Sequence, residues 1–505
     1  MQIKKLSALC ALALASMAGS AHAALTAAQT TILNDANSNG RVVFISGASA
    51  VQKGFAAGVA SLFSGTPFFL GVDNTKNIDS NDHLAVAGTL AVAAGGWPAG
   101  SNVVVVYRVK GGSVMGVNPV ARAESIEALD VLAANCGSLG SGTAAAPYKC
   151  STTTRIPDAG VSDVAPALFK NPVNTEGETA AAELNAAELA DLAARPIYGL
   201  AFGIPVTKTV GSNVKFTRST VAAIMSGNVG TWNQVDAAES GDIVICRRVP
   251  GSGTQAVMNL WAGSYPCSGD ANTPADRDTS GNYDGTDFSE TVAGVTKNYT
   301  GQYTINAGTG GVVVVENSTS GQVRDCLNKA VTGGSYDTAD RDGNLVKVTF
   351  NGAGHKAIGV LSMDSLSSST AAGNWQFRSL DGAGKMTADL QAGGTAVVDG
   401  SSLTGTGKFP TKTAYENGDW DLQGWVSFNL PSRTTGNKKA LLENFAAKVS
   451  DPAVLAVVSS LKNVAMAIPG QDAPFDFPAG PGSQMLDAAY LGNNQCAPYN
   501  RNYND

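Results

Sequence analysis

The chain has little of the chemistry on which hydrolytic catalysis usually depends. Its 505 residues include only 3 histidines, and one of these lies within the first 23 residues. The sequence contains no Gly-x-Ser-x-Gly turn, no His-Glu-x-x-His helix and no phosphate-binding P-loop. We therefore expect a protein that is not an enzyme and requires no cofactor, with His83 and His355 at the surface or at strand edges rather than acting as bases.

Basic residues are scarce relative to acidic ones. The chain has 34 Lys and Arg against 41 Asp and Glu, for a formal net charge of −7. A surface with this acidic excess disfavours nucleic acid or an anionic membrane as a partner. It does not exclude a small anion held in a locally basic pocket.

Long apolar runs are absent after the first 23 residues. Those residues read "MQIKKLSALCALALASMAGSAHA", with Lys4 and Lys5, an apolar stretch at 6–17 and a final Ala-His-Ala. This order predicts a secretory signal cleaved after Ala23, which would remove two lysines and leave a net charge of −9. We expect an exported protein, periplasmic or extracellular, with no membrane insertion.

Closely spaced cysteine pairs are also absent. The chain has 7 cysteines and no Cys-x-x-Cys, so in an exported protein they indicate disulfides rather than a metal site. Sequence alone leaves about 15 connectivities open for six cysteines. We expect Cys136 to pair with Cys150 and Cys246 with Cys267, the full disulfide set being Cys136, Cys150, Cys246, Cys267, Cys326 and Cys496.

Three segments pass from a β-branched strand through a small-residue turn into an apolar helix. They are residues 41–63, 103–117 and 242–261. Strand–turn–helix units predict parallel strands and an α/β fold, and 505 residues suffice for two or three lobes. Each turn also presents the free N–H groups of a helix N-terminus, which favour anions.

A polar stretch at 268–311 predicts a surface insertion. Within it, "DRDTSGNYDGTD" has the spacing of a calcium loop, although no flanking helices are evident and its last position holds Asp where the longer Glu is usual. A solvated turn is the alternative interpretation. The possible calcium ligands are Asp276, Asp278, Ser280, Asp284 and Asp287.

The third turn, "RVPGSGT", places an arginine beside two hydroxyls and several backbone donors. Those groups suit a tetrahedral oxyanion, and an ordinary helix cap is the alternative. The segment resembles the Arg-x-x-Gly-Ser-Gly-Thr signature of the periplasmic phosphate-binding proteins of the phosphate-specific ABC transporter. Further resemblances follow in family order: "ISGASAV", "YRVKGGSVMGV", "GVSDVAP", "VAAIMSGNVGTWNQV", "HKAIGVLSMDSL" and "GWVSFNLP".

This resemblance implies a two-lobed type II periplasmic-binding-protein fold with parallel-rich sheets. The first lobe would comprise 24–195 plus 421–505, and the second lobe 196–420 with the polar insertion. An ABC permease would be the partner. The resemblance nominates the following phosphate ligands: Ser46, Ser49, Ser113, Asp163, Arg248, Ser252, Gly253 and Thr254.

Asp163 has a particular role in this expectation, because it would accept a hydrogen bond from the proton of hydrogen phosphate. Sulfate carries no such proton and would be repelled by the carboxylate. Without the resemblance, Asp163 would be interpreted as a turn or cap residue.

Two features depart from the family. Val51 and Gln52 replace a threonine and an aromatic residue after the first turn, and Lys110 and Met115 make the second turn bulkier. The altered first turn, together with the polar insertion, the expected disulfides and the low lysine content, favours an alternative function: a secreted or surface protein that reuses the fold as a structural or adhesive module. A secreted phosphatase is the third hypothesis. Convergence of the nominated side chains would support a binding protein, and their separation would support the structural module.

Overall fold

The structure is a computed structural model. It describes residues 24–457 except 138, 213, 278–280, 293, 309–310, 366–372, 381–414 and 416–419, and after these residues 461, 465–468, 488–489, 496 and 500–501. The expected signal at 1–23 lies outside the described residues. No helix in the described ranges combines the length and apolar character needed to cross a bilayer.

A 14-stranded sheet forms the backbone of the molecule, in the order β15-β10-β18-β9-β21-β8-β1-β4-β3-β2-β6. At one side, β1 (Val42–Gly47) runs parallel to both β4 (Asn102–Arg108) and β8 (Ala159–Ser162). At the other side, β10 (Ile243–Arg248) runs parallel to β15 (Val313–Asn317) and β18 (Lys356–Gly359). The prediction of an α/β fold rich in parallel strands is confirmed.

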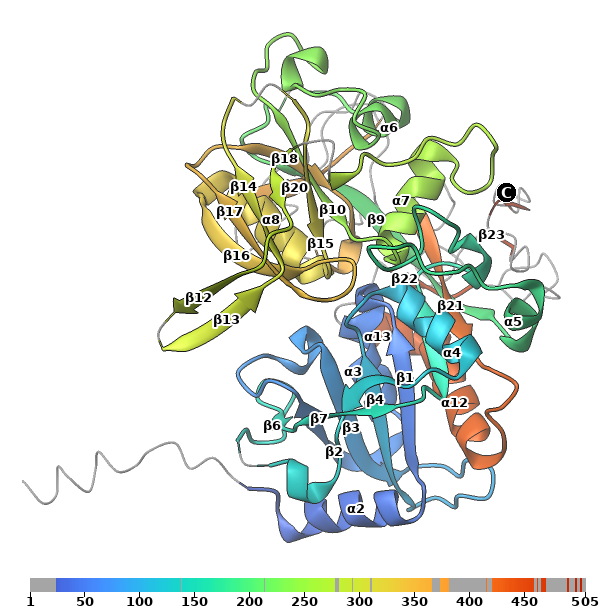
Figure 1. Ribbon diagram of the computed structural model, residues 1–505. Helices are drawn as coiled ribbons and strands as arrows, with labels where there is room; N and C mark the ends of the chain where they lie inside the picture. Colours follow the sequence, from blue (N-terminus) through green and yellow to red (C-terminus); the bar gives the residue numbers. More distant parts are fainter. Residues whose placement is uncertain are drawn as a thin grey trace, which may run out of the picture.

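Two strands connect the two sides of the sheet. The strand β9 (Arg195–Thr207) is 13 residues long and pairs with β21 (Gln423–Asn429) in antiparallel register. Figure 1 shows the blue and cyan elements gathered in one half and the yellow-green elements in the other, with β9 and β21 between them. The other strands of this sheet are β2 (Phe63–Gly71), β3 (His83–Leu90), β6 (Tyr148–Lys149), β19 (Leu361–Ser362), β20 (Trp375–Arg378) and β22 (Ala465–Met466).

Helices cover the sheet where the apolar segments predict them. The first unit gives α3 (Gln52–Ala60) after β1, and the third gives α7 (Gly253–Gly263) after β10. After β4 the chain forms a 3-10 turn, η3 (Ser113–Gly116), and only a five-residue helix, α4 (Asn118–Arg122). The remaining helices are α2 (Ala27–Ser38), α5 (Ala186–Asp191), α6 (Arg218–Met225), α8 (Ser320–Thr332), α12 (Gly436–Val449) and α13 (Pro452–Val457).

The polar stretch at 268–311 contributes strands instead of a simple loop. It forms the hairpin β12 (Phe288–Val292) and β13 (Val295–Tyr299), which projects from the upper half in Figure 1. A separate four-stranded sheet combines β11 (Tyr283–Asp284) and β14 (Gly301–Ile305) from this stretch with β16 (Gly334–Ala339) and β17 (Leu345–Phe350). Two small pairs complete the strands: β5 (Ile126–Leu129) with β7 (Thr152–Arg155), and β23 (Ala488–Ala489) with β24 (Asn500–Arg501).

All six expected disulfide cysteines are paired, but only one of the two expected pairs is correct. Cys136 bonds Cys150, as predicted. The predicted Cys246–Cys267 pair is wrong: Cys246 bonds Cys326, and Cys267 bonds Cys496. The reason is tertiary packing, because α8 lies against β10 and brings a cysteine 80 residues away to the buried Cys246.

Candidate functional site

The three turns that follow β1, β4 and β10 meet at one place in the molecule. The parallel pairing of β1 with β4 puts their carboxyl ends at the same edge, as expected for ligand sites of α/β sheets. The backbone N–H of Val114, in the turn after β4, donates to the carbonyl of Gly251 after β10, at 2.9 Å. The second and third turns are therefore in direct contact across the two halves.

The third turn has a conformation that its glycines permit. Gly251 has φ +85°, a region that favours glycine. Ser252 caps α7 and accepts a hydrogen bond from the Gln255 N–H at 3.4 Å, so the helix-cap interpretation is correct for this side chain. A Cβ on Gly253 would lie 2.4 Å from the Ser113 Oγ and 2.8 Å from the Asp163 Cβ. Gly253 thus lets the two turns touch.

We expect Gly253→Ala to destabilise this contact. Because the added methyl group overlaps Ser113 and Asp163, the free energy of unfolding should fall by about 1–3 kcal/mol, measured by urea denaturation. Gly269→Ala is the matched control, since a Cβ there meets no atom within 4 Å. Equal stabilities of the two variants would contradict close packing at Gly253.

Asp163 is the most unusual group of the site. Its side chain is 1% exposed, and its Oδ2 accepts a hydrogen bond from the Thr254 hydroxyl at 3.0 Å. Its Oδ1 is buried and has no hydrogen-bond partner among the described residues. Burial raises the pKa of Asp163 to about 6, against the opposing effects of the Thr254 hydrogen bond and the charge of Arg248.

Arg248 is buried at the end of β10, and four of its donor contacts go to protein atoms. Its Nε donates to the Asn317 carbonyl at 3.1 Å and its Nη2 to the Ser318 carbonyl. Its Nη1 donates to the hydroxyls of Ser49 and Ser320, at 3.2 Å each. Burial lowers the pKa of Arg248 to about 10, and the charge of Asp163 opposes this shift, so the group is cationic at neutral pH.

The nominated residues of the first lobe differ in their roles. Ser113 is buried, and its Oγ accepts a hydrogen bond from the Asp163 N–H at 3.4 Å. The Ser46 hydroxyl donates to the Met115 carbonyl at 2.6 Å and joins the first turn to the second. Ser49 extends toward the other half, where it accepts from Arg248. The nominated residues therefore lie at the ends of β1 and β10, on the three turns and on the segment after β8. Thr254 and Ser113 contact Asp163, and Ser49 contacts Arg248.

A cavity of about 80 Å³ adjoins the Ser49 and Ser320 side of Arg248. Its lining includes Arg324 and three carboxylates, those of Asp79, Asp82 and Asp364. Acidic groups outnumber basic ones here, so this cavity is a poor place for a multivalent anion. Val51 belongs to the core, and Gln52 lines this cavity while its amide donates to the Asn81 carbonyl.

The sequence interpretation missed the segment that follows β15. This segment supplies the carbonyls of Asn317 and Ser318 and the hydroxyl of Ser320, which all accept from Arg248. Its sequence "VVVVENSTSGQ" has the same strand–turn–helix pattern as the three units that were recognised. Because β15 pairs in parallel with β10, the pattern could have placed this turn at the site.

The two histidines are less exposed than expected. His83 is 3% exposed at the start of β3, and burial lowers its pKa to about 4. His355 is 9% exposed and contacts the Asn351 carbonyl at 3.2 Å. The expectation of a surface position was wrong for both histidines, whereas both lie at the start of a strand: His83 opens β3 and His355 directly precedes β18.

The calcium loop stays a prediction. The Asp276 carboxylate is paired with Arg341, and that of Asp284 accepts from the Thr286 hydroxyl and N–H. Asp278 and Ser280 lie outside the described residues. Within the described ranges, no group of three or more His, Cys, Asp or Glu residues is arranged to hold a metal ion.

Comparison with known families bears on the middle of the chain. Residues 167–372 match the PBP superfamily domain. Over these residues the match agrees with the resemblance recognised in the sequence. A search of curated proteins finds no match.

Solved structures of low identity also match. A protein from Clostridium perfringens solved with bound phosphate is 11% identical, with TM-score 0.39, over 85% of this chain and 100% of that one. PstS from Borrelia burgdorferi is 11% identical, with TM-score 0.33, over 85% and 99% of the two chains. A phosphate binding protein from Stenotrophomonas maltophilia is 16% identical, with TM-score 0.34, over 81% and 84%.

Proposed function

We propose that the protein is an exported solute-binding protein that binds phosphate, or a closely related protonated oxyanion, where its three turns meet. In this proposal it delivers the ligand to an ABC permease and performs no catalysis. The superfamily match at 167–372 is compatible with a binding role. The observation that carries the proposal is the environment of Asp163.

The Oδ1 of Asp163 is an acceptor that no donor in the described part of the chain satisfies. A buried carboxylate oxygen without a hydrogen bond is costly, and such groups cluster at functional sites. Hydrogen phosphate can donate its proton to this oxygen, which would offset part of that cost. The Thr254 hydroxyl, already bonded to the same carboxylate, fixes its orientation.

Arg248 and the third turn supply positive charge and hydrogen-bond donors near Asp163. Arg248 acts electrostatically on Asp163, and the turn at 251–254 opens α7, a helix of 11 residues. The free N–H groups of a helix N-terminus favour anions. An anion that contacts both Asp163 and the third turn would bridge the two halves, and ligand-dependent closure would then create a surface for a permease.

Isothermal titration calorimetry of residues 24–505 with phosphate tests the proposal, with sulfate as competitor. Thr254→Val removes a hydrogen bond to a charged group, which is worth about 1.5–3 kcal/mol; we therefore expect phosphate affinity to fall by at least about tenfold. Thr332→Val is the matched control, because its hydroxyl bonds only carbonyls at the end of α8. An absence of phosphate heat, or unchanged binding in both Arg248→Ala and Asp163→Asn, would refute the proposal.

One observation favours the structural or adhesive module as a second candidate. Four donor contacts of Arg248 are made to protein acceptors, which is how a structural arginine is held. In that case Arg248→Ala would lower the melting temperature, and the unmutated protein would give no heat with phosphate. The same calorimetric experiment therefore separates the two candidates.

A further inference from the structure

A second cavity lies beside the turns after β4 and β10, and each half of the molecule contributes one of its walls. Its volume is about 290 Å³, larger than the cavity beside Ser49. One wall comes from the turn after β4, with Arg108, Lys110 and Met115. The facing wall includes Val249 and Ser318, together with the loop at 340–343. None of the eight nominated phosphate ligands lines it.

Arg108 is the feature of this cavity that the fold leaves unexplained. It ends β4 in register with His83 and is 8% exposed. Its Nε and Nη1 are buried and have no hydrogen-bond partner within the described part of the chain. A buried guanidinium without acceptors is costly, because it has lost water and gained no partner.

The other charges around the cavity are already matched. Lys110 pairs with Glu127 at 3.4 Å, and Arg341 is held by Glu316 and Asp276. Glu127 and Asp82 attract Arg108 through space, but burial outweighs them and lowers its pKa to about 10. Arg108 therefore remains a cation, and its Nε and Nη1 make no hydrogen bond within the described residues.

The acidic groups of the lining are held by neighbouring donors. Glu176 accepts twice from the Asn118 amide, at 3.0 and 3.1 Å. Asp340 accepts from the Thr300 hydroxyl and from the N–H groups of Asp342 and Asn344. Asp342 accepts from the Glu178 N–H at 3.0 Å. Their remaining lone pairs can accept from hydroxyl or amino groups of a ligand.

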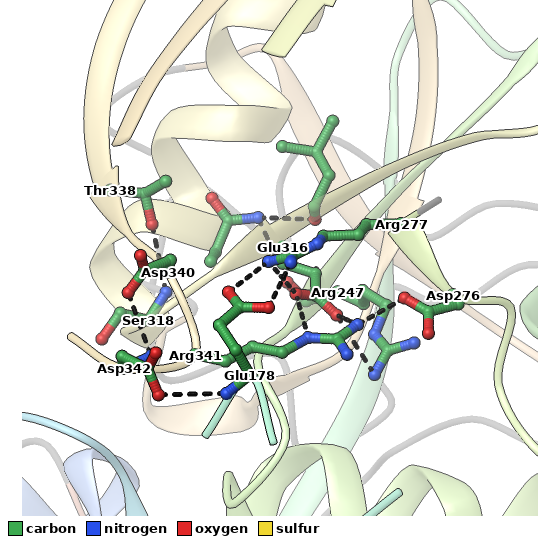
Figure 2. Close-up of polar contacts among 12 residues, drawn as sticks. Glu178, Arg247, Asp276, Arg277, Glu316, Ser318, Thr338, Asp340, Arg341 and Asp342 are labelled. Carbon is green, nitrogen blue, oxygen red and sulfur yellow. Dashed lines mark hydrogen bonds and ion pairs between the residues drawn. The ribbon is translucent and has the colours of Figure 1, made fainter. Parts of the chain in front are cut away.

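The loop that forms the facing wall is firmly placed. Figure 2 shows Arg341 bonded to Glu316, and Asp342 bonded both to Asp340 and to Glu178. The Gly177 N–H donates to the Arg341 carbonyl at 3.2 Å, which joins this loop to the segment that carries Glu176. A preformed cavity with converging polar groups is the usual form of a small-molecule site.

From these contacts we propose that this cavity is a second binding site, specific for a small organic oxyanion larger than inorganic phosphate. The anionic group, a carboxylate or a phosphate ester, lies against the planar fork of Arg108. Hydroxyl or amino groups of the ligand face Asp340, Asp342 and Glu176. The cavity has more than three times the volume of the one beside Ser49, which leaves room for a ligand larger than inorganic phosphate.

The site is tested by calorimetry with glycerol 3-phosphate and glycerate as probes, and with inorganic phosphate for comparison. We expect one organic anion or both to bind, and the affinity for it to fall at least about tenfold in Arg108→Gln, since hydrogen bonds to charged groups are lost. Stronger binding of glycerol 3-phosphate would identify a phosphate ester, and stronger binding of glycerate a carboxylate. Arg218→Gln is the matched control, because Arg218 is half exposed on α6, away from the cavity lining.

Variants of the phosphate site keep this test independent of the proposed function. Thr254→Val should weaken phosphate binding and leave the organic anion unchanged, whereas Arg108→Gln should do the reverse. Because the Nε and Nη1 of Arg108 make no hydrogen bond within the described residues, Arg108→Gln should not lower the melting temperature. Lys110→Gln, at a side chain that is 38% exposed, provides a milder second variant with a smaller loss of affinity. The inference would be overturned if neither organic anion gave heat. It would also be overturned if Thr254→Val and Arg108→Gln lowered the affinity for the organic anion equally.

Discussion

Sulfate should bind the protein about 30-fold more tightly at pH 5 than at pH 7.5. Burial raises the pKa of Asp163 to about 6, so its carboxyl is ionised above that pH and protonated below it. Ionised Asp163 repels sulfate, which has no proton to donate, whereas protonated Asp163 can donate to it. If sulfate binds only the protonated form, its apparent affinity follows the fraction of that form, which rises from roughly 3% to roughly 90%.

Phosphate should not show this rise, because hydrogen phosphate can donate to the ionised carboxylate at pH 7.5. The measurement is calorimetric titration with sulfate and with phosphate at both pH values, at constant chloride concentration. Asp163→Asn supplies the control: an amide does not titrate, so sulfate binding should become independent of pH and should already be measurable at pH 7.5. A flat sulfate affinity in the unmutated protein would show that Asp163 does not select the ligand.

The first and third strand–turn–helix units of the site could be predicted from neighbouring residues in the sequence. The units at 41–63 and 242–261 fold into β1 with α3 and β10 with α7, because strand periodicity, small turn residues and an apolar helix face follow one another directly. The turn chemistry around Gly251 and Ser252 was likewise readable from adjacent residues.

The features that were missed depend on contacts distant in the sequence. Cys326 reaches Cys246 only because α8 packs on β10, and spacing along the chain favoured the nearer Cys267. Arg108 ends β4 at a cavity whose other wall comes from Val249, Ser318 and the loop at 340–343, an arrangement that no local pattern encodes. The unpartnered Oδ1 of Asp163 is likewise a property of the packed turns, since an exposed aspartate in the same motif would be hydrated.

Loss of the Glu316 carboxylate should have the largest effect on stability. Glu316 is 1% exposed at β15 and lies among three arginines, as Figure 2 shows. Arg341 donates to it at 2.8 and 2.9 Å, and the guanidinium nitrogens of Arg247 and Arg277 lie 3.6 and 3.8 Å from its oxygens. Breaking a buried ion pair by removing one partner costs about 3–5 kcal/mol, so Glu316→Ala should lower the free energy of unfolding by about that amount.

The same substitution should also weaken ligand binding, because the arginines that it releases position both candidate sites. Arg247 donates to the backbone carbonyls of Arg248 and Ala275, and Arg341 belongs to the loop that lines the larger cavity. Urea denaturation gives the stability change, and phosphate calorimetry below the unfolding transition gives the binding change.

Glu443→Ala is the matched control, since its pair with Lys439 spans 3.9 Å between side chains that are about half exposed and should contribute under about 1 kcal/mol. If the two glutamate variants lost equal stability, the charge cluster would contribute no more than a surface ion pair, and the rigid placement of the loop at 340–343 would need another cause.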